Sequence, residues 1–471
     1  MSCPRVCLRT RARVVFALLV IVSMSAAGVG ADVPARLSLA DAVTLALGVN
    51  ANLKQSEQDY ETALSRLRVA GLQTSFEVGG EAGQERTPDE SQLFSRAFGS
   101  MSYENLLGTK ASLDVSPVST GDENNYLRIS LRHPLTQGRG LLSEKADILA
   151  GARSFASVRN KEVYLTRQAK TLEVIERYYQ AVLSREQVKV QQKAVDIAEE
   201  AADGAHKRAD AGLVAGIEVS RADIRVAQTK DELNLRTQAA RGALDRLTLA
   251  IGVGVGETPE LTDTVPETAS DTPGLTDAIG TALKNRLEMA VYDVRLSDQA
   301  RRLAIAKDQF RSGVDVVAGF SSADSEPGAI STSLFGESSS NVGVEVRIPL
   351  DKRILREDRD TAERDADVLR RLRLHQMEEI AEQVRRAYLD LEEAKTSLGI
   401  LTDNKKVADD NLRMAKRMVD AGLVSNREIL EAQEALTRVE NGLLSARTDL
   451  YLAGLNLKYA MGEDLTTVVS R

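Results

Sequence analysis

The stretch Ala211-Gly212-Leu213-Val214 decides the fold, because it recurs as Ala421-Gly422-Leu423-Val424. The residues around it recur at the same offset of 210, so that residues 174–252 align without a gap on residues 384–462. A gap-free match of this length indicates that one supersecondary unit is used twice in the chain.

The beginnings of the two copies also resemble each other. Leu39–Val43 (LADAV) matches Leu275–Ile279 (LTDAI) at an offset of 236, so the first copy holds 26 more residues between its matched regions. We therefore expect a first copy over 32–256, a linker over 257–273, a second copy over 274–465 and a tail over 466–471.

Proline is missing from two long parts of the chain. The ten prolines leave residues 135–258 and 350–471 without any, and glycine is sparse in both. Since proline breaks a helix interior and glycine weakens it, both parts are predicted to form very long helices. A helix over 142–209 would be about 100 Å long at 1.5 Å per residue, a length that an ordinary globular core does not need.

The two AGLV stretches interrupt these helices. Glycine directly after a run of helix-forming residues is a common C-terminal cap, where the chain takes a left-handed conformation. In the second copy Ser425 or Asn426 is expected to cap the following helix, with Glu428 in its first turn. The first copy has Gly216 and Glu218 there instead. Each stretch is therefore predicted to be a tight reversal between two antiparallel helices.

Short segments between the helices alternate between apolar and polar residues. The alternation is found over 76–82, 127–131, 314–320 and 342–348, which predicts four strands with two faces in different surroundings. Those surroundings are either a soluble core with an edge sheet, or lipid on one face and a lumen on the other. Residues 87–123 and 322–341 are predicted to be surface loops, with a short extra hairpin formed by 103–104 and 110–115.

Four strands of about ten residues match the thickness of a bilayer but cannot close a barrel alone. An open sheet edge in lipid would leave backbone groups unpaired, at a cost of several kcal/mol each. The chain is therefore expected to oligomerise, and three copies would close a twelve-stranded β-barrel. The predicted fold is mainly α with a small antiparallel β portion, built as two tandem repeats of strand pairs and very long helices.

The N-terminus has the pattern of an export signal. Four arginines precede an apolar run over 14–22 and small residues lead to Ala31, which predicts a signal peptide over 1–31. An uncleaved membrane anchor is the alternative, but the run is shorter than the roughly 20 residues of a membrane span. Both cysteines, Cys3 and Cys7, precede this run, so the exported chain would contain no cysteine.

Composition and motifs argue against several classes of function. The formal net charge of −8 argues against nucleic acid as a partner. His133, His206 and His375 show no ligand spacing, so neither a metal nor another cofactor is expected. The glycines over 252–256 follow a helix and lack the Gly-Lys-Ser/Thr of a phosphate loop. No nucleophile, base and orienting group converge on a motif, and we expect the protein not to be an enzyme.

Together these features resemble the TolC family of outer-membrane efflux channels, over about residues 38–465. The resemblance is carried by Leu39–Val43, by the strand ends Arg132–Leu135 and Arg347–Leu350, and by the two AGLV reversals. It implies a homotrimer with a β-barrel in the outer membrane, on an α-helical barrel that reaches across the periplasm. It also implies a passive exit duct of a tripartite efflux or type I secretion system. A periplasmic adaptor (a membrane fusion protein) would join the duct to an inner-membrane transporter of the RND or ABC type.

The resemblance also assigns site residues. The adaptor-docking tips would be Ala211, Gly212, Leu213, Val214, Ala421, Gly422, Leu423 and Val424. A lumenal gate near the tips would draw on Glu199, Glu200, Asp203, Asp409 and Asp410, for which a solvated helix face is the alternative. The lipoprotein cysteine of many relatives is missing after the apolar run. Barrel and trimer alone would therefore hold the chain in outer-membrane lipid.

The main alternative function is that of a soluble periplasmic coiled-coil adaptor or scaffold. Adaptors also contain helical hairpins, but they lack two full copies of the unit and barrel-type alternating strands.

Overall fold

The computed structural model describes residues 35–86, 91–120, 126–212, 214–253, 259–265, 273–323 and 337–466. The predicted signal peptide over 1–31 and Leu213 lie outside the described residues. The same holds for most of the linker and for residues 467–471 of the tail.

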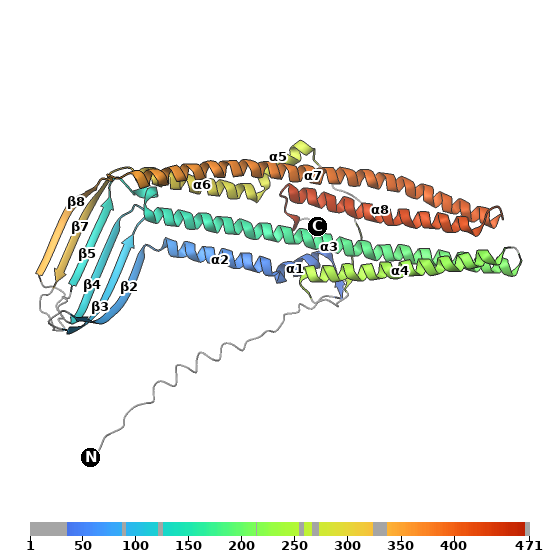
Figure 1. The fold of residues 1–471 in the computed structure, drawn as a ribbon, viewed down its shortest axis with the longest axis horizontal. Coiled ribbons are helices and arrows are strands. Elements are labelled where there is room, and N and C mark those ends of the chain that lie inside the picture. The colour runs from blue at the N-terminus through green and yellow to red at the C-terminus, as the bar shows by residue number, and fades with distance from the viewer. Residues whose placement is uncertain are drawn as a thin grey trace, which may run out of the picture.

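The molecule is elongated, with a β-sheet at one end and two helical reversals at the other (Figure 1). The helices are α1 (Leu39–Val49), α2 (Ala51–Gly71), the 3-10 turn η1 (Gly140–Leu142), α3 (Glu144–Asp210), α4 (Gly216–Ile251), α5 (Leu275–Asn285), α6 (Leu287–Asp308), α7 (Arg353–Asp420) and α8 (Asn426–Ala460). The strands are β1 (Arg36–Leu37), β2 (Thr74–Arg86), β3 (Ser91–Glu104), β4 (Lys110–Thr120), β5 (Tyr126–Pro134), β6 (Glu260–Leu261), β7 (Gly313–Ala323) and β8 (Glu337–Arg347). The predicted fold class, mainly helical with a small antiparallel sheet, is confirmed.

Two helices run without interruption for most of the molecule's length, as the missing prolines predict. Helix α3 has 67 residues and α7 has 68. At the start of α3, the Ser143 hydroxyl accepts a hydrogen bond from the Ala146 amide at 3.2 Å. Acidic residues occupy the first turn of α3 and basic residues its last turn, which suits the helix dipole at both ends.

The large sheet has six strands in the order β2-β3-β4-β5-β7-β8, all antiparallel. The four predicted strands are present as β2, β5, β7 and β8. The prediction of loops over 87–123 with only a short hairpin was wrong, because β3 and β4 are long strands that pair along their length with β2 and β5. The count of twelve strands for three copies rested on four strands per chain, and the described sheet has six.

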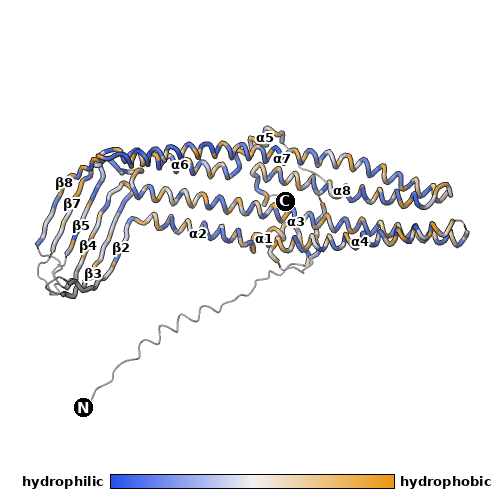
Figure 2. Tube along the Cα trace, in the orientation of Figure 1, coloured by the Kyte–Doolittle hydropathy of each residue, from blue (hydrophilic) through white to orange (hydrophobic). Residues whose placement is uncertain are grey.

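Apolar residues are spread along the helices rather than concentrated in one of them (Figure 2). They meet in two main buried clusters halfway along the molecule. One joins α1, α3 and α4 around Ile175, Tyr178 and Leu247, and the other joins α5, α7 and α8 around Ile380 and Leu391. The core is therefore a seam between helices, as expected for a chain that is poor in aromatic residues.

The two-residue strands β1 and β6 pair in parallel beside the first cluster. The Tyr178 hydroxyl donates to the Leu37 carbonyl at 3.0 Å and to Asp263 Oδ2 at 2.8 Å. Burial, and next the hydrogen bond to the Asp263 carboxylate, raise the pKa of Tyr178 to about 12. This side chain therefore links α3 to β1 and to the described part of the linker.

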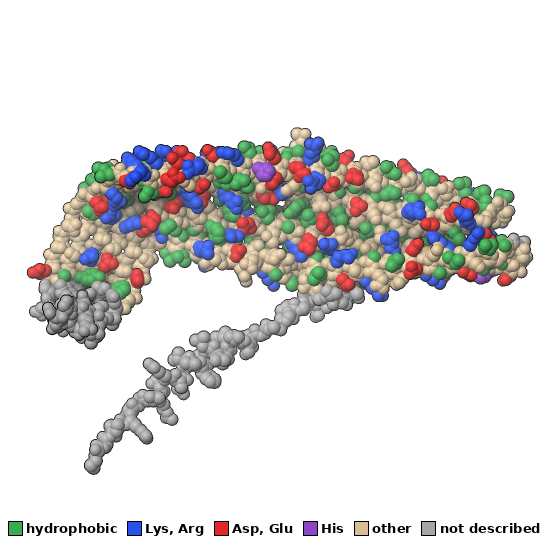
Figure 3. All heavy atoms as spheres, viewed as in Figure 1, with side chains coloured by type: hydrophobic (Ala, Val, Ile, Leu, Met, Phe, Trp, Pro, Cys, Tyr) green, Lys and Arg blue, Asp and Glu red, His purple; other side chains and the backbone are tan. Residues whose placement is uncertain are grey.

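Charged side chains are scattered over the helices, whereas the described part of the sheet on the visible face carries few of them (Figure 3). Within the described residues, no helix is both long enough and apolar enough to cross a membrane.

Candidate functional site

Two helical reversals form the end of the molecule opposite the sheet (Figure 1). One joins α3 to α4 and the other joins α7 to α8. Gly212 has a φ of +69° and Gly422 a φ of +71°, a left-handed conformation that glycine adopts without steric cost. The two glycines of the AGLV stretches thus end the helices as the sequence predicts.

The hydrogen bonds of the reversals show how the helices end. The Gly212 amide donates to the Ala209 carbonyl at 2.9 Å, and the Leu423 amide donates to the Met418 carbonyl at 2.9 Å. Ser425 occupies the N-cap position of α8, but its side chain makes no capping hydrogen bond. The expected side-chain cap at Ser425 was therefore wrong, and Asn426 is already the first residue of the helix.

The predicted tip residues differ in exposure. Ala211, Gly212, Ala421 and Gly422 are exposed and Val214 is half-buried. Val424 packs against a buried apolar cluster between α7 and α8. Leu423 is 72% exposed, although apolar side chains of this size usually gain free energy by burial.

Ile217, which the sequence reasoning missed, adds to this apolar surface. It lies in the first turn of α4 and is 59% exposed. Its place one turn beyond an AGLV reversal is the signal that could have found it. The described tips thus present Leu423 and Ile217 as large apolar side chains to solvent.

The five candidate gate acids are all exposed, and their surroundings differ. Glu199 Oε1 lies 2.7 Å from Lys230 Nζ on α4, and Asp410 pairs with Arg413 one turn further along α7. No ion pair of Glu200, Asp203 or Asp409 is found among the described residues. Within one described chain, no three acidic or histidine side chains come close enough together to hold a metal ion.

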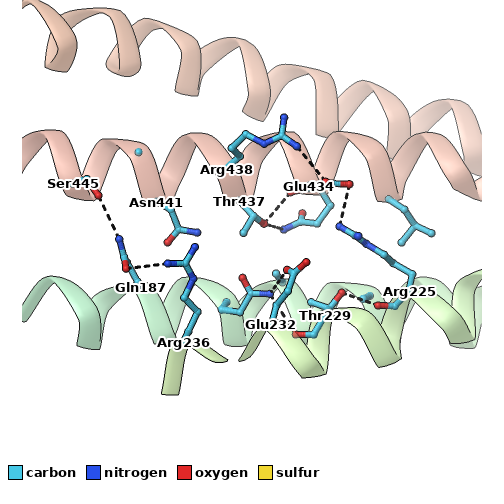
Figure 4. Close-up of a pocket in the computed structure, with 16 residues that line it drawn as sticks. Gln187, Arg225, Thr229, Glu232, Arg236, Glu434, Thr437, Arg438, Asn441 and Ser445 are labelled. Carbon is cyan, nitrogen blue, oxygen red and sulfur yellow. Dashed lines mark hydrogen bonds and ion pairs between the residues drawn. The ribbon is translucent and has the colours of Figure 1, made fainter. Parts of the chain in front are cut away.

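A polar groove of about 470 Å³ lies between the two helical hairpins (Figure 4). Arg225 on α4 pairs with Glu434 on α8 at 3.2 Å. Gln187 on α3 donates to the Ser445 hydroxyl at 3.4 Å and accepts from Arg236 at 3.5 Å. The two hairpins are thus joined here by side-chain hydrogen bonds and an ion pair rather than by apolar packing.

The sequence reasoning missed this groove, although the repeat contains a signal for it. At the offset of 210, Gln191 falls on Leu401, and Arg225 falls on Ala435. Polar residues in one copy where the other has apolar ones indicate a face that meets a different neighbour. The side-chain oxygens of Gln433 and Asn441, which also line the groove, are buried without a hydrogen-bond partner.

Comparison with known proteins agrees with this architecture. The profile of the outer membrane efflux protein family matches residues 155–253 and 278–463, and the chain belongs to this family. Among curated proteins, none matches the chain significantly by sequence.

Several solved structures share the fold. The channel protein CusC is 15% identical with a TM-score of 0.67, covering 90% of this chain and 92% of that chain. The outer membrane protein VceC from Vibrio cholerae is 15% identical with a TM-score of 0.66, covering 90% of this chain and 96% of that chain. The outer membrane channel MtrE from Neisseria gonorrhoeae, solved in an open state, is 13% identical with a TM-score of 0.67, covering 91% and 89%. At these identities the matches show that the chain shares the fold of these proteins.

Proposed function

We propose that this chain is one protomer of a passive exit duct in the outer membrane, coupled to an inner-membrane pump through a periplasmic adaptor. The observation that carries the proposal is that the two ends of the molecule differ in structure. An amphipathic sheet lies at one end, and two exposed helical reversals lie at the other, in a chain of the outer membrane efflux family.

The sheet supports a homo-oligomer, for which we propose the homotrimer that the family resemblance implies. Strands β2 and β8 are the two edges of the described sheet. In lipid such edges must be paired, and β8 of one copy with β2 of the next closes a ring. The exposed apolar side chains of the sheet, among them Val78, Val342 and Val344, then face outer-membrane lipid.

The long helices support the same ring. Exposed Ile400, Val407 and Met414 recur every seven residues along α7, the spacing of a coiled-coil seam. On α4, exposed Ile217 and Ile224 have the same spacing. Since α7 and α4 lie on opposite sides of the protomer (Figure 1), the seam of one copy would pack against α4 of the next. The helices would then form a tunnel that extends into the periplasm.

The tips are the proposed docking site for the adaptor. Leu423 gives each copy an apolar anchor at the end of the tunnel, and burial of such a side chain in a pocket of the adaptor would contribute about 1.5–3 kcal/mol. The inner-membrane partner is a transporter of the RND or ABC type. The proposed lumenal gate draws on Glu199, Glu200, Asp203, Asp409 and Asp410, which are all exposed near the tips.

Membrane fractionation followed by sizing in detergent tests the proposal. The expected result is an outer-membrane fraction that contains a species of three chains. A soluble monomer in the periplasmic fraction would contradict the proposal and favour a coiled-coil adaptor or scaffold.

A test of docking is the Leu423→Asp variant. It should still form a trimer but bind the adaptor at least about tenfold more weakly, since a lost apolar anchor costs more than 1.4 kcal/mol. The matched control is Leu249→Asp, at an exposed leucine near the other end of α4, which should leave adaptor binding unchanged.

A further inference from the structure

The strands β3 and β4 form a hairpin that, among the described residues, has no counterpart in the second copy. In the second copy β7 pairs with β8, whereas in the first copy β3 and β4 lie between β2 and β5 in the sheet. The first copy is 26 residues longer between its matched regions, which agrees with an inserted pair of strands.

The inserted strands are as long as their neighbours. Strand β3 has 14 residues and β4 has 11, compared with 11 each in β7 and β8. A strand that crosses a bilayer needs about 9–11 residues. Each inserted strand is therefore long enough to cross.

The inserted strands also continue the two faces of the sheet. Phe76, Met101, Leu113, Ile129 and Phe320 are successive partners across five strands. They form one apolar row that passes through β3 and β4 without a break. The hairpin thus places Met101 and Leu113 on the same face as the apolar residues of the neighbouring strands.

The opposite face shows a polar row in the same register. Ser75, Ser102, Ser112 and Ser130 are successive partners from β2 to β5. The hydroxyls of Ser75 and Ser102 are 2.6 Å apart, and those of Ser112 and Ser130 are 2.8 Å apart. Hydrogen-bonded serines on one face and apolar residues on the other suit a lumen and lipid, respectively.

The turn between β3 and β4 is built into the junction with α3. The Gly140 amide donates to the Leu107 carbonyl at 3.3 Å, and the Ser143 hydroxyl donates to the Leu106 carbonyl at 3.1 Å. Gly108 has a φ of +87°, and a Cβ there would lie 2.6 Å from the Gly138 carbonyl oxygen. The turn of the hairpin is therefore held by hydrogen bonds and close packing to the residues that lead into α3.

From these observations we infer that β3 and β4 cross the outer membrane, so that three copies close an eighteen-stranded barrel instead of a twelve-stranded one. The inference rests on the proposed function, which supplies the membrane and the ring of three. The diameter of a barrel grows roughly linearly with strand number, so the ring is about 1.5 times as wide as one of twelve strands. Barrels of 16–18 strands leave an aqueous channel. The outer mouth thus admits wider cargo than a twelve-stranded mouth would.

Quenching by brominated lipid tests the inference. Cys3 and Cys7, the only two cysteines, are replaced by serine, and one cysteine at a time is introduced and labelled with a fluorophore. The test positions are Met101 and Leu113 on the apolar face and Ser102 and Ser112 on the polar face. Ile129 and Ser130 in β5 provide the matched reference pair. The purified protein is reconstituted in phosphatidylcholine vesicles with and without brominated acyl chains.

The expected result is that labels at Met101 and Leu113 are quenched as strongly as the label at Ile129. Labels at Ser102 and Ser112 should be as little quenched as the label at Ser130. Quenching at Ile129 without quenching at Met101 and Leu113 would overturn the inference while leaving the proposed channel intact. Absence of quenching at Ile129 as well would contradict the proposed function itself.

Discussion

The two helical reversals follow the same backbone path but are packed with side chains of different size. Near the first reversal, the buried cluster consists of Ala202, Ala205 and Ala222. Near the second, the buried cluster contains Leu412, Val419, Ile429 and Leu436 together with two alanines. The same backbone path is therefore compatible with small buried side chains between the two helices and with large ones.

The repeat offset shows that these differences occur at equivalent positions. Ala202 corresponds to Leu412, and Val226 corresponds to Leu436. Since burial contributes roughly 0.8 kcal/mol per CH₂ group, the second hairpin gains more stability from its own seam. We infer that the two tips have different local stabilities, and that the first opens more readily.

The largest expected effect comes from truncating a large buried side chain in the second hairpin. Leu412→Ala or Leu436→Ala should lower the opening free energy of residues 408–436 by about 2–4 kcal/mol, because each deletes a buried leucine side chain. Hydrogen exchange of the detergent-solubilised trimer measures this. In the unaltered protein, amides over 198–226 should exchange faster than those over 408–436. The exposed control Ala435→Ser should change neither region, and equal exchange in the two hairpins would contradict the comparison.

A smaller effect is expected where the copies differ at the middle of the molecule. Tyr178 is fully buried and hydrogen-bonded to Leu37 and Asp263, whereas its counterpart Tyr388 is only partly buried. Tyr178→Phe should cost about 1–2 kcal/mol of stability, since Asp263 loses a buried partner. Tyr388→Phe should cost less than about 0.5 kcal/mol, the usual range for such surface changes. Thermal unfolding of both variants measures the difference, and equal losses would remove this contrast.

The same tyrosine gives a pH dependence. Its pKa is raised from 10.0 to about 12 in the folded chain, so the protonated hydroxyl stabilises the fold. This contribution is fully present below about pH 10 and is lost as the pH rises towards about 12. Thermal melts at pH 9 and pH 11 should therefore show a smaller alkaline loss in Tyr178→Phe than in the unaltered chain. An identical alkaline loss in both proteins would speak against this role of Tyr178.

An effect of about the same size as that of Tyr178→Phe is expected at the turn glycines, where the copies agree. Gly212→Ala and Gly422→Ala should each destabilise their reversal by about 1–2 kcal/mol, because both residues have positive φ. Gly216→Ala is the matched control, since Gly216 is the first residue of α4 and an added Cβ meets open space. Local hydrogen exchange is the readout. A neutral Gly422→Ala would show that the second reversal does not depend on the left-handed residue.

The smallest effect is expected in the groove between the hairpins. Arg225→Met should cost less than about 1 kcal/mol, because Glu434 in its ion pair is about half exposed. A double-mutant cycle with Glu434→Gln measures the coupling energy. A coupling energy above about 2 kcal/mol would mean that the ion pair joins the two hairpins more strongly than the solvent exposure of Glu434 suggests.

Local chemistry made the helices and reversals predictable from the sequence. The missing prolines indicate α3 and α7, and Gly212 and Gly422 mark their ends. The hairpin of β3 and β4 was underestimated because its alternation is imperfect. Phe98 lies on the polar face, where its ring covers Gly79, a position at which any Cβ would collide with it. An aromatic side chain on the polar face hides the two-residue period that otherwise reveals a strand.

The groove between the hairpins and the ion pairs of the candidate gate acids depend on contacts between distant parts of the chain. Glu199 is engaged by Lys230, and Arg225 reaches Glu434 on the other hairpin. Neither pairing follows from local spacing, since each joins helices whose relative rotation is set by the buried seams. The assignment of docking tips and gate acids stays a prediction, which adaptor binding and conductance measurements can test.

Electron cryo-microscopy of the protein in lipid nanodiscs tests the central claim most directly, because it counts chains and strands in one image. We predict three chains, six strands from each in one closed barrel of eighteen, and six helical reversals at the opposite end. A barrel of twelve strands with β3 and β4 outside the wall would contradict the wider mouth. A single chain with an open sheet would contradict the channel itself.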